Sequence, residues 1–197
     1  MKKLVFILLI VTSLGFTTVS YAALQDNGGG LIYDTDRNIT WYNAPSVALA
    51  WPNAMMNYVA TLNVGGVTGW RLPTALNQDG TGPCYPFNCT DSEMGHLFYN
   101  ELGGVAGQSI ATTHNSNYAL FTNLLAFDYW TSTPYPDTAG YYWAFQFQNG
   151  RQLASSGASY YILPVHDGNI GVPEPTTMLL LGLGLVGLSR ARKKFSN

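Results

Sequence analysis

Large aromatic residues alternate with smaller or polar residues near the end of the chain, as they do in a half-buried strand. Residues 143–148 read Trp-Ala-Phe-Gln-Phe-Gln, and this period of two predicts a strand with an apolar face and a polar face that includes Ala144. Asn149 and Gly150 follow as a hairpin turn. Further strand-like segments predict a small antiparallel sheet, and they cover residues 129–133, 151–155 and 160–168.

An earlier segment, residues 31–42, has the pattern of a β-hairpin, because strand-forming residues flank a polar turn. Asp34 and Asp36 in this turn also have the first spacing of a calcium-binding loop. Ile39 and Pro45, however, stand where that loop requires glycine and glutamate. We therefore predict a turn without a calcium site.

A segment between the hairpin and the sheet has the spacing of an amphipathic helix. It begins near Trp51, with Pro52 in its first turn, and ends before Gly65 and Gly66. Its apolar face is predicted to consist of Met55, Tyr58, Val59 and Leu62.

A second helix is predicted over residues 90–102. Thr90 and Glu93 match a capping box at its start, and its apolar stripe consists of Met94, Leu97, Phe98 and Leu102. Helices that precede an antiparallel sheet indicate an α+β fold rather than α/β.

The two ends of the chain differ from the part between them. Residues 1–22 have a basic start, an apolar stretch and small residues at the end, the pattern of a signal peptide removed by signal peptidase. Residues 172–197 contain a short apolar helix at 176–189 and then basic residues. This run is shorter than the roughly 20 residues of a comfortable membrane span. Residues 23–171, here called the body, form one predicted domain.

Positive charge is concentrated at the two ends. All lysines lie there, and the body retains only Arg37, Arg71 and Arg151 against most of the 11 acidic residues. Binding of a polyanion requires clustered cationic side chains. The composition therefore excludes nucleic acid as a partner and disfavours heavily sulfated polysaccharide.

Cys84 and Cys89 are the two cysteines of the chain. In an exported protein such a pair predicts a disulfide, with a redox or nucleophilic role as the alternative. A metal site would need further ligands, and His96 alone is near in sequence. We therefore predict neither a metal nor a cofactor.

The histidines do not form a catalytic pattern. His96, His114 and His166 have no recognised spacing to a nucleophile or to one another. Each is expected on the surface or in satisfied packing, and we predict that the protein is not an enzyme.

Aromatic side chains are the candidate ligand-binding groups, because the body is rich in rigid, amphipathic rings. Tyr135, Tyr141 and Tyr160, with Asp137, are the predicted binding residues near turns. Tryptophans in predicted strands are expected in the core, and these are Trp41, Trp70, Trp130 and Trp143.

Two of the body's arginines have different predicted environments. Arg71 lies beside Trp70 in a short extended segment, so its guanidinium is expected to pair with a buried acid, for which Glu93 is a candidate. Arg151 directly follows the hairpin turn and is expected to be solvated.

Four motifs of the body together resemble the Lcl C-terminal domain family. They are "GLIYDTDRNITW", "GWRLPT", "YWTST" and "YYWAFQFQNGR", and the resemblance covers about residues 30–168. It implies a C-type-lectin-like fold, as modified in formylglycine-generating enzymes, and a surface ligand-binding or adhesive module. The chain departs from the family at Ile162 and His166, where arginines are usual. It also lacks the calcium-dependent sugar motifs of C-type lectins and the late copper-binding cysteine pair of the enzymes.

The C-terminal segment resembles a PEP-CTERM sorting signal, with Val-Pro-Glu-Pro, a short apolar helix and a basic end in order. The residues that carry the resemblance are Pro173, Glu174, Pro175, Arg190 and Arg192. It implies a Gram-negative exporter, transient association with the inner membrane, recognition by an exosortase, removal of the tail, and a link to extracellular polysaccharide.

These observations predict an exported surface or matrix protein that binds a glycan or mediates adhesion in exopolysaccharide or biofilm. A metal-dependent enzyme of the formylglycine-generating type is one alternative. A structural matrix protein without a specific ligand is another.

Overall fold

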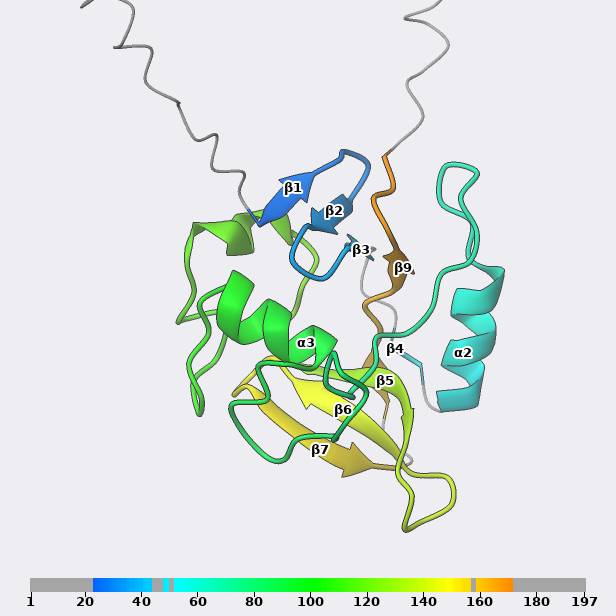
Figure 1. Ribbon diagram of the computed structural model, residues 1–197, viewed down its shortest axis with the longest axis vertical. Coiled ribbons are helices and arrows are strands. Elements are labelled where there is room, and N and C mark those ends of the chain that lie inside the picture. The colour runs from blue at the N-terminus through cyan, green and yellow to red at the C-terminus, as the bar shows by residue number, and fades with distance from the viewer. Residues whose placement is uncertain (1–22, 44–47, 50–51, 157–158, 172–197) are drawn as a thin grey trace, which may run out of the picture.

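The computed structural model describes residues 23–43, 48–49, 52–156 and 159–171. The predicted signal peptide and the predicted sorting signal at 172–197 lie outside these residues. Within them the chain forms two largely antiparallel sheets and short helices (Figure 1), which confirms the predicted α+β class.

The first sheet has four antiparallel strands in the order β1-β2-β3-β9. The predicted hairpin is formed by β2 (Leu31–Asp34) and β3 (Ile39–Tyr42), and β1 (Leu24–Asp26) precedes it. The last strand, β9 (Val165–Asp167), pairs with β3. The end of the body is therefore held against its beginning.

The second sheet has the order β4-β8-β5-β6-β7. An antiparallel meander of β5 (Asp128–Pro134), β6 (Tyr142–Gln146) and β7 (Arg151–Ser155) forms most of it. The short strands β4 (Ala48–Leu49) and β8 (Tyr160–Tyr161) extend one edge, and β8 runs parallel to β5.

The prediction of a continuous last strand over 160–168 is wrong. Ile162, Leu163 and Pro164 are buried between β8 and β9, and they carry the chain from one sheet to the other. Proline cannot donate a ladder hydrogen bond, which favours such a break.

Both predicted helices are present. The first is α2 (Pro52–Thr61), and the second is α3 (Glu93–His96), which continues as the π-helix η2 (Leu97–Glu101). A 3₁₀ helix, η3 (Ser116–Leu120), lies in the following loop. Tyr58 is 38% exposed, so its predicted place on the apolar face of α2 is wrong.

Ser92, and not Thr90, caps α3. Its hydroxyl accepts a hydrogen bond from the Gly95 N–H at 3.3 Å. The Glu93 carboxylate is occupied elsewhere, because it accepts hydrogen bonds from Arg71 and from the Thr74 N–H. The predicted capping box is therefore wrong.

Apolar side chains cover both faces of β6. Phe145 packs in the main core against Phe98 from η2, whereas Ala144 lies in a second cluster with Trp130 and with Met55 from α2. The prediction that Ala144 belongs to a polar face is wrong for this reason.

Candidate functional site

An aromatic pocket of about 330 Å³ lies on the second sheet, lined by Tyr85, Tyr135, Trp143 and Ala154. The Trp143 ring centroid lies 5.7 Å from that of Tyr135 and 6.4 Å from that of Tyr85. This volume is at the lower end of the range of small-molecule sites. We call the space between these four residues the aromatic pocket.

The pocket combines a fixed wall with accessible rings. Trp143 is 7% exposed, whereas Tyr85 is 59% exposed. The ring of Tyr141, 37% exposed, lies 6.5 Å from Tyr135. A ligand would therefore contact aromatic faces that are already held in place.

The disulfide loop brings Tyr85 to the sheet. Cys84 and Cys89 form the predicted disulfide. Gln152 on β7 fixes the loop, because its side-chain amide donates to the Cys84 carbonyl at 2.9 Å and its backbone N–H donates to the Pro86 carbonyl at 2.7 Å. Tyr85 lies between these two anchored residues.

Polar groups border the pocket. Arg151 donates from Nη2 to the Tyr85 hydroxyl at 2.8 Å, and its guanidinium carbon lies 5.5 Å from the Tyr85 ring centroid. The prediction that Arg151 is solvated is therefore wrong, since the side chain packs on an aromatic ring. Hydrogen bonding to Asp137 and the negative charge of Asp137 raise the pKa of Tyr135.

The structure brings together only some of the predicted binding residues. Tyr135, Tyr141 and Asp137 lie at or beside the aromatic pocket. Tyr160 lies elsewhere, stacked 4.6 Å from Trp130 and hydrogen-bonded to Ser155.

Tyr85 is missing from the sequence prediction. The signal for it is its position between Cys84 and Pro86, since a loop that is closed and stiffened on both sides presents a side chain at low entropic cost.

The predicted structural tryptophans are buried, and they are Trp41, Trp70, Trp130 and Trp143. Trp143 is a buried core residue that also lines the aromatic pocket. Its indole Nε1 is buried and has no hydrogen-bond partner within the described part of the chain.

Arg71 joins three segments of the body through its guanidinium. It forms two parallel hydrogen bonds with the predicted partner Glu93, at 2.9 and 2.7 Å, and two more with Oδ1 of Asp167 on β9, at 2.6 and 3.1 Å. Burial lowers the pKa of Arg71, but the hydrogen bonds and charges of Glu93 and Asp167 reverse this and raise it. Arg71 thus stays positively charged and links Glu93 to Asp167 in the folded protein.

A second pocket, of about 150 Å³, lies beside this ion pair between Arg37, Asn77 and Asp91. It is below the usual size of a small-molecule site. Arg37 is already paired with Asp91 at 3.1 Å, and this pocket therefore adds no free charged group.

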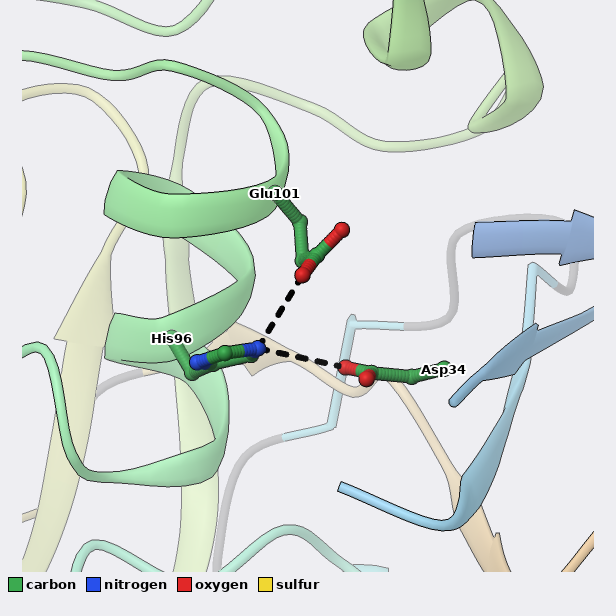
Figure 2. A group of neighbouring side chains, drawn as sticks. All are labelled: Asp34, His96 and Glu101. Atoms are coloured by element: carbon green, nitrogen blue, oxygen red, sulfur yellow. Dashed lines mark hydrogen bonds and ion pairs between the residues drawn. The ribbon is translucent and has the colours of Figure 1, made fainter. Parts of the chain in front are cut away.

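One group of side chains among the described residues has the composition of a metal site, and it consists of Asp34, His96 and Glu101 (Figure 2). All three residues are buried. Burial raises the pKa of Asp34, although a backbone hydrogen bond from Arg37 acts in the opposite direction.

No helix in the described ranges combines the length and apolar character needed to cross a membrane. The predicted apolar helix at 176–189 lies outside those ranges.

Comparison with known proteins assigns one segment of the chain. No curated protein and no solved structure matches the chain. The likeness of the body to the Lcl C-terminal domain family therefore stays a prediction. A family model of the PEP-CTERM protein-sorting motif matches residues 171–193. The chain therefore carries a PEP-CTERM protein-sorting motif, which implies export, processing by exosortase and attachment at the cell surface.

Proposed function

We propose that the body is a non-enzymatic module that binds a neutral or weakly charged glycan in the aromatic pocket while the protein is attached at the cell surface. The observation that carries the proposal is the arrangement of Tyr85, Tyr135 and Trp143 around one open pocket. The predicted C-type-lectin-like character of the body and its link to extracellular polysaccharide are in keeping with it.

The chemistry of the pocket suits a sugar ring. One face of a pyranose is lined by C–H groups, which pack on aromatic rings, while its hydroxyl groups need hydrogen-bond partners. The Trp143 and Tyr135 rings supply the apolar surface. Asp137 and the Tyr85–Arg151 pair supply acceptors and donors at the rim.

The charge of the body indicates which glycans are favoured. Arg151 is the cation beside the pocket, and it is shared with Tyr85, whereas Asp137 interacts with Tyr135. The carboxylate of Asp137 would repel the sulfate groups of a heavily sulfated chain, and Arg151, which would attract them, is already bonded to Tyr85. A neutral or weakly charged polymer does not meet this repulsion.

Binding measurements on the exported protein test the proposal. Glycan arrays and pull-down with extracellular polysaccharide, including that of the producing organism, identify a ligand, and calorimetry gives its Kd. Tyr85→Ala and Tyr135→Ala should each weaken binding by about 5- to 30-fold, because each removes an aromatic contact worth about 1–2 kcal/mol.

Tyr58→Ala is the matched control, since Tyr58 is an exposed tyrosine on α2 that does not line the pocket. Its affinity should equal that of the unmodified protein. Equal weakening by Tyr58→Ala would refute the assignment of the site. Failure to retain any extracellular polysaccharide would refute glycan binding altogether.

A further inference from the structure

Three buried side chains, two from the continuous helix of α3 and η2 and one from the first sheet, point toward one another (Figure 2). Asp34 ends β2, His96 ends α3, and Glu101 ends η2. The His96 Nε2 atom lies 3.1 Å from Glu101 Oε1 and 3.9 Å from Asp34 Oδ2. One ligand atom from each residue lies within 4.8 Å of the other two.

The π-helix creates this arrangement. In an α-helix, with 3.6 residues per turn, positions five apart differ by about 140° around the axis, and their side chains diverge. The wider i to i+5 turn of a π-helix brings them to one side, and such turns are frequent at functional sites. His96 and Glu101 have this separation, and the π-helix begins directly after His96.

One atom of the group lacks a well-formed hydrogen bond. Asp34 is 0% exposed, and its Oδ1 atom accepts hydrogen bonds from the backbone N–H groups of Asp36 and Arg37. Its Oδ2 atom, which lies 3.9 Å from His96 Nε2, accepts no well-formed hydrogen bond, and the nearby Trp41 indole N–H interacts with the Asp34 carboxylate without meeting hydrogen-bond geometry. An unsatisfied buried carboxylate oxygen is costly.

Arg37 and Arg71 form their ion pairs with acidic residues outside the group. Arg37 donates its side chain to Asp91 and to the Thr90 carbonyl, and Arg71 pairs with Glu93 and Asp167. Two buried carboxylates therefore share one imidazole. A divalent cation with two carboxylates and a neutral histidine would form a group with no net charge.

We propose that Asp34, His96 and Glu101 form a structural site for a divalent transition metal of the Zn²⁺ class. A set of one imidazole and two carboxylates suits such ions better than Ca²⁺ or Mg²⁺, which prefer oxygen ligands alone. Zinc holds these ligands at about 2.0–2.2 Å in a tetrahedral arrangement, so two of them lie about 3.3–3.6 Å apart. The separations of 3.1 Å and 3.9 Å from His96 to Glu101 and Asp34 lie within about 0.6 Å of this value, whereas the two carboxylates, which lie within 4.8 Å of each other, would have to approach by up to about 1.5 Å.

Asn100 would orient the histidine. Its side-chain nitrogen lies 3.0 Å from His96 Nδ1, and the nitrogen and oxygen of a side-chain amide are interchangeable assignments. With the oxygen at that position, Asn100 accepts a hydrogen bond from Nδ1–H and leaves the Nε2 lone pair for the metal, as is usual for metal-bound histidine. The backbone carbonyl of Glu101 accepts hydrogen bonds from the side-chain amides of Asn115 and Asn117, which fixes the end of η2.

The test uses the exported protein, freed of metal by a chelator and then dialysed against Zn²⁺. About one zinc per chain should remain by elemental mass spectrometry. At a hundredfold excess of Zn²⁺ over Kd, Tm should rise by about 5 °C or more, because the ion binds only the folded state. Co²⁺ in place of Zn²⁺ should give the visible d–d absorption of a site with nitrogen and oxygen ligands.

His96→Gln should abolish zinc retention and the rise in Tm. The matched control is His114→Gln, because His114 bonds the Ile110 carbonyl and stacks on Tyr118 outside the group; it should retain both. If His96→Gln does not fold, Asn100→Ala serves instead. It changes an exposed residue and should weaken zinc binding about 10- to 100-fold.

Two results would overturn the proposal. One is a metal-free protein whose Tm does not change with Zn²⁺, Mn²⁺ or Co²⁺ and which retains no stoichiometric metal. The other is a zinc-dependent rise in Tm that persists in both His96→Gln and Asn100→Ala, since the ion would then bind elsewhere. Loss of glycan binding has no bearing on this site, and loss of zinc binding has none on the aromatic pocket.

Discussion

Replacing Arg71 by alanine should destabilise the body by about 2–3 kcal/mol, because the Glu93 carboxylate would lose two of its hydrogen bonds while buried. Glu93 is 9% exposed, and the Thr74 N–H would remain as its partner. Breaking a buried ion pair costs about 3–5 kcal/mol. The Arg71 side chain is 35% exposed, so water replaces part of the lost interaction, and we place the cost below that range.

Of the two carboxylates that pair with Arg71, Glu93 should contribute more than Asp167 to the free energy of unfolding. The Asp167 side chain is 75% exposed, and exposed ion pairs contribute about 0–1 kcal/mol. Arg71→Lys should cost about 1 kcal/mol, because lysine keeps the charge but cannot form two parallel hydrogen bonds with Glu93.

Urea and thermal unfolding of single and double variants measure these terms. In a double-mutant cycle, Arg71→Ala with Glu93→Gln should give a coupling energy of about 1.5 kcal/mol or more, and Arg71→Ala with Asp167→Asn less than about 0.5 kcal/mol. For a domain of this size, 2–3 kcal/mol corresponds to a fall in Tm of roughly 4–12 °C. Equal coupling to Glu93 and Asp167, or a cost of Arg71→Ala below about 1 kcal/mol, would refute the reasoning.

Three further variants test other features. Replacing Cys84 and Cys89 by serine should cost about 2 kcal/mol in urea unfolding, since their separation is 5 residues; an unchanged unfolding midpoint would contradict this. Gly95→Ala should cost more than about 2 kcal/mol although alanine favours helices, because its Cβ would overlap the Cys89 carbonyl oxygen; a stabilised variant would show that this packing is wrong. Burial raises the pKa of Asp128 above 3.8 in the folded protein, although hydrogen bonds from Gln146 and others act in the opposite direction. The folded protein therefore loses stability as the pH rises from about 3.8 through the raised pKa, because the carboxyl group ionises less readily in the folded state than in the unfolded state. Asp128→Asn should remove that loss, and a stability difference that does not change between pH 3 and pH 7 would contradict it.

Local sequence patterns predict the individual helices and strands better than they predict which strands pair with each other. The hairpin at 31–42 formed as expected, because turn residues and strand-forming residues are neighbours in sequence. The pairing of β9 with β3 joins residues more than a hundred positions apart, and no local pattern contains that information. Arg71 and Glu93 were predicted partners because a cation in an apolar segment requires a buried acid.

The group of Asp34, His96 and Glu101 could not be predicted from the sequence. A helical spacing of five places side chains on different faces of an α-helix, and the apolar stripe of residues 94–102 does not reveal the wider π turn. Asp34 also belongs to a hairpin that reads as an ordinary turn, and only the tertiary packing brings it to the helix.

The pairing of β9 with the first hairpin has a mechanical consequence for a protein attached at the cell surface. The described chain begins at β1 and ends just beyond β9, and both ends lie on the side of the molecule opposite β6 and β7 (Figure 1). The sorting motif begins at residue 171, directly after Asn169 and Ile170, which accept hydrogen bonds from the Asn27 side chain. Tension between the C-terminal attachment and a ligand held in the aromatic pocket would therefore act first on the β3–β9 ladder, which lies next to the sorting motif, before it reaches the sheet that carries the pocket.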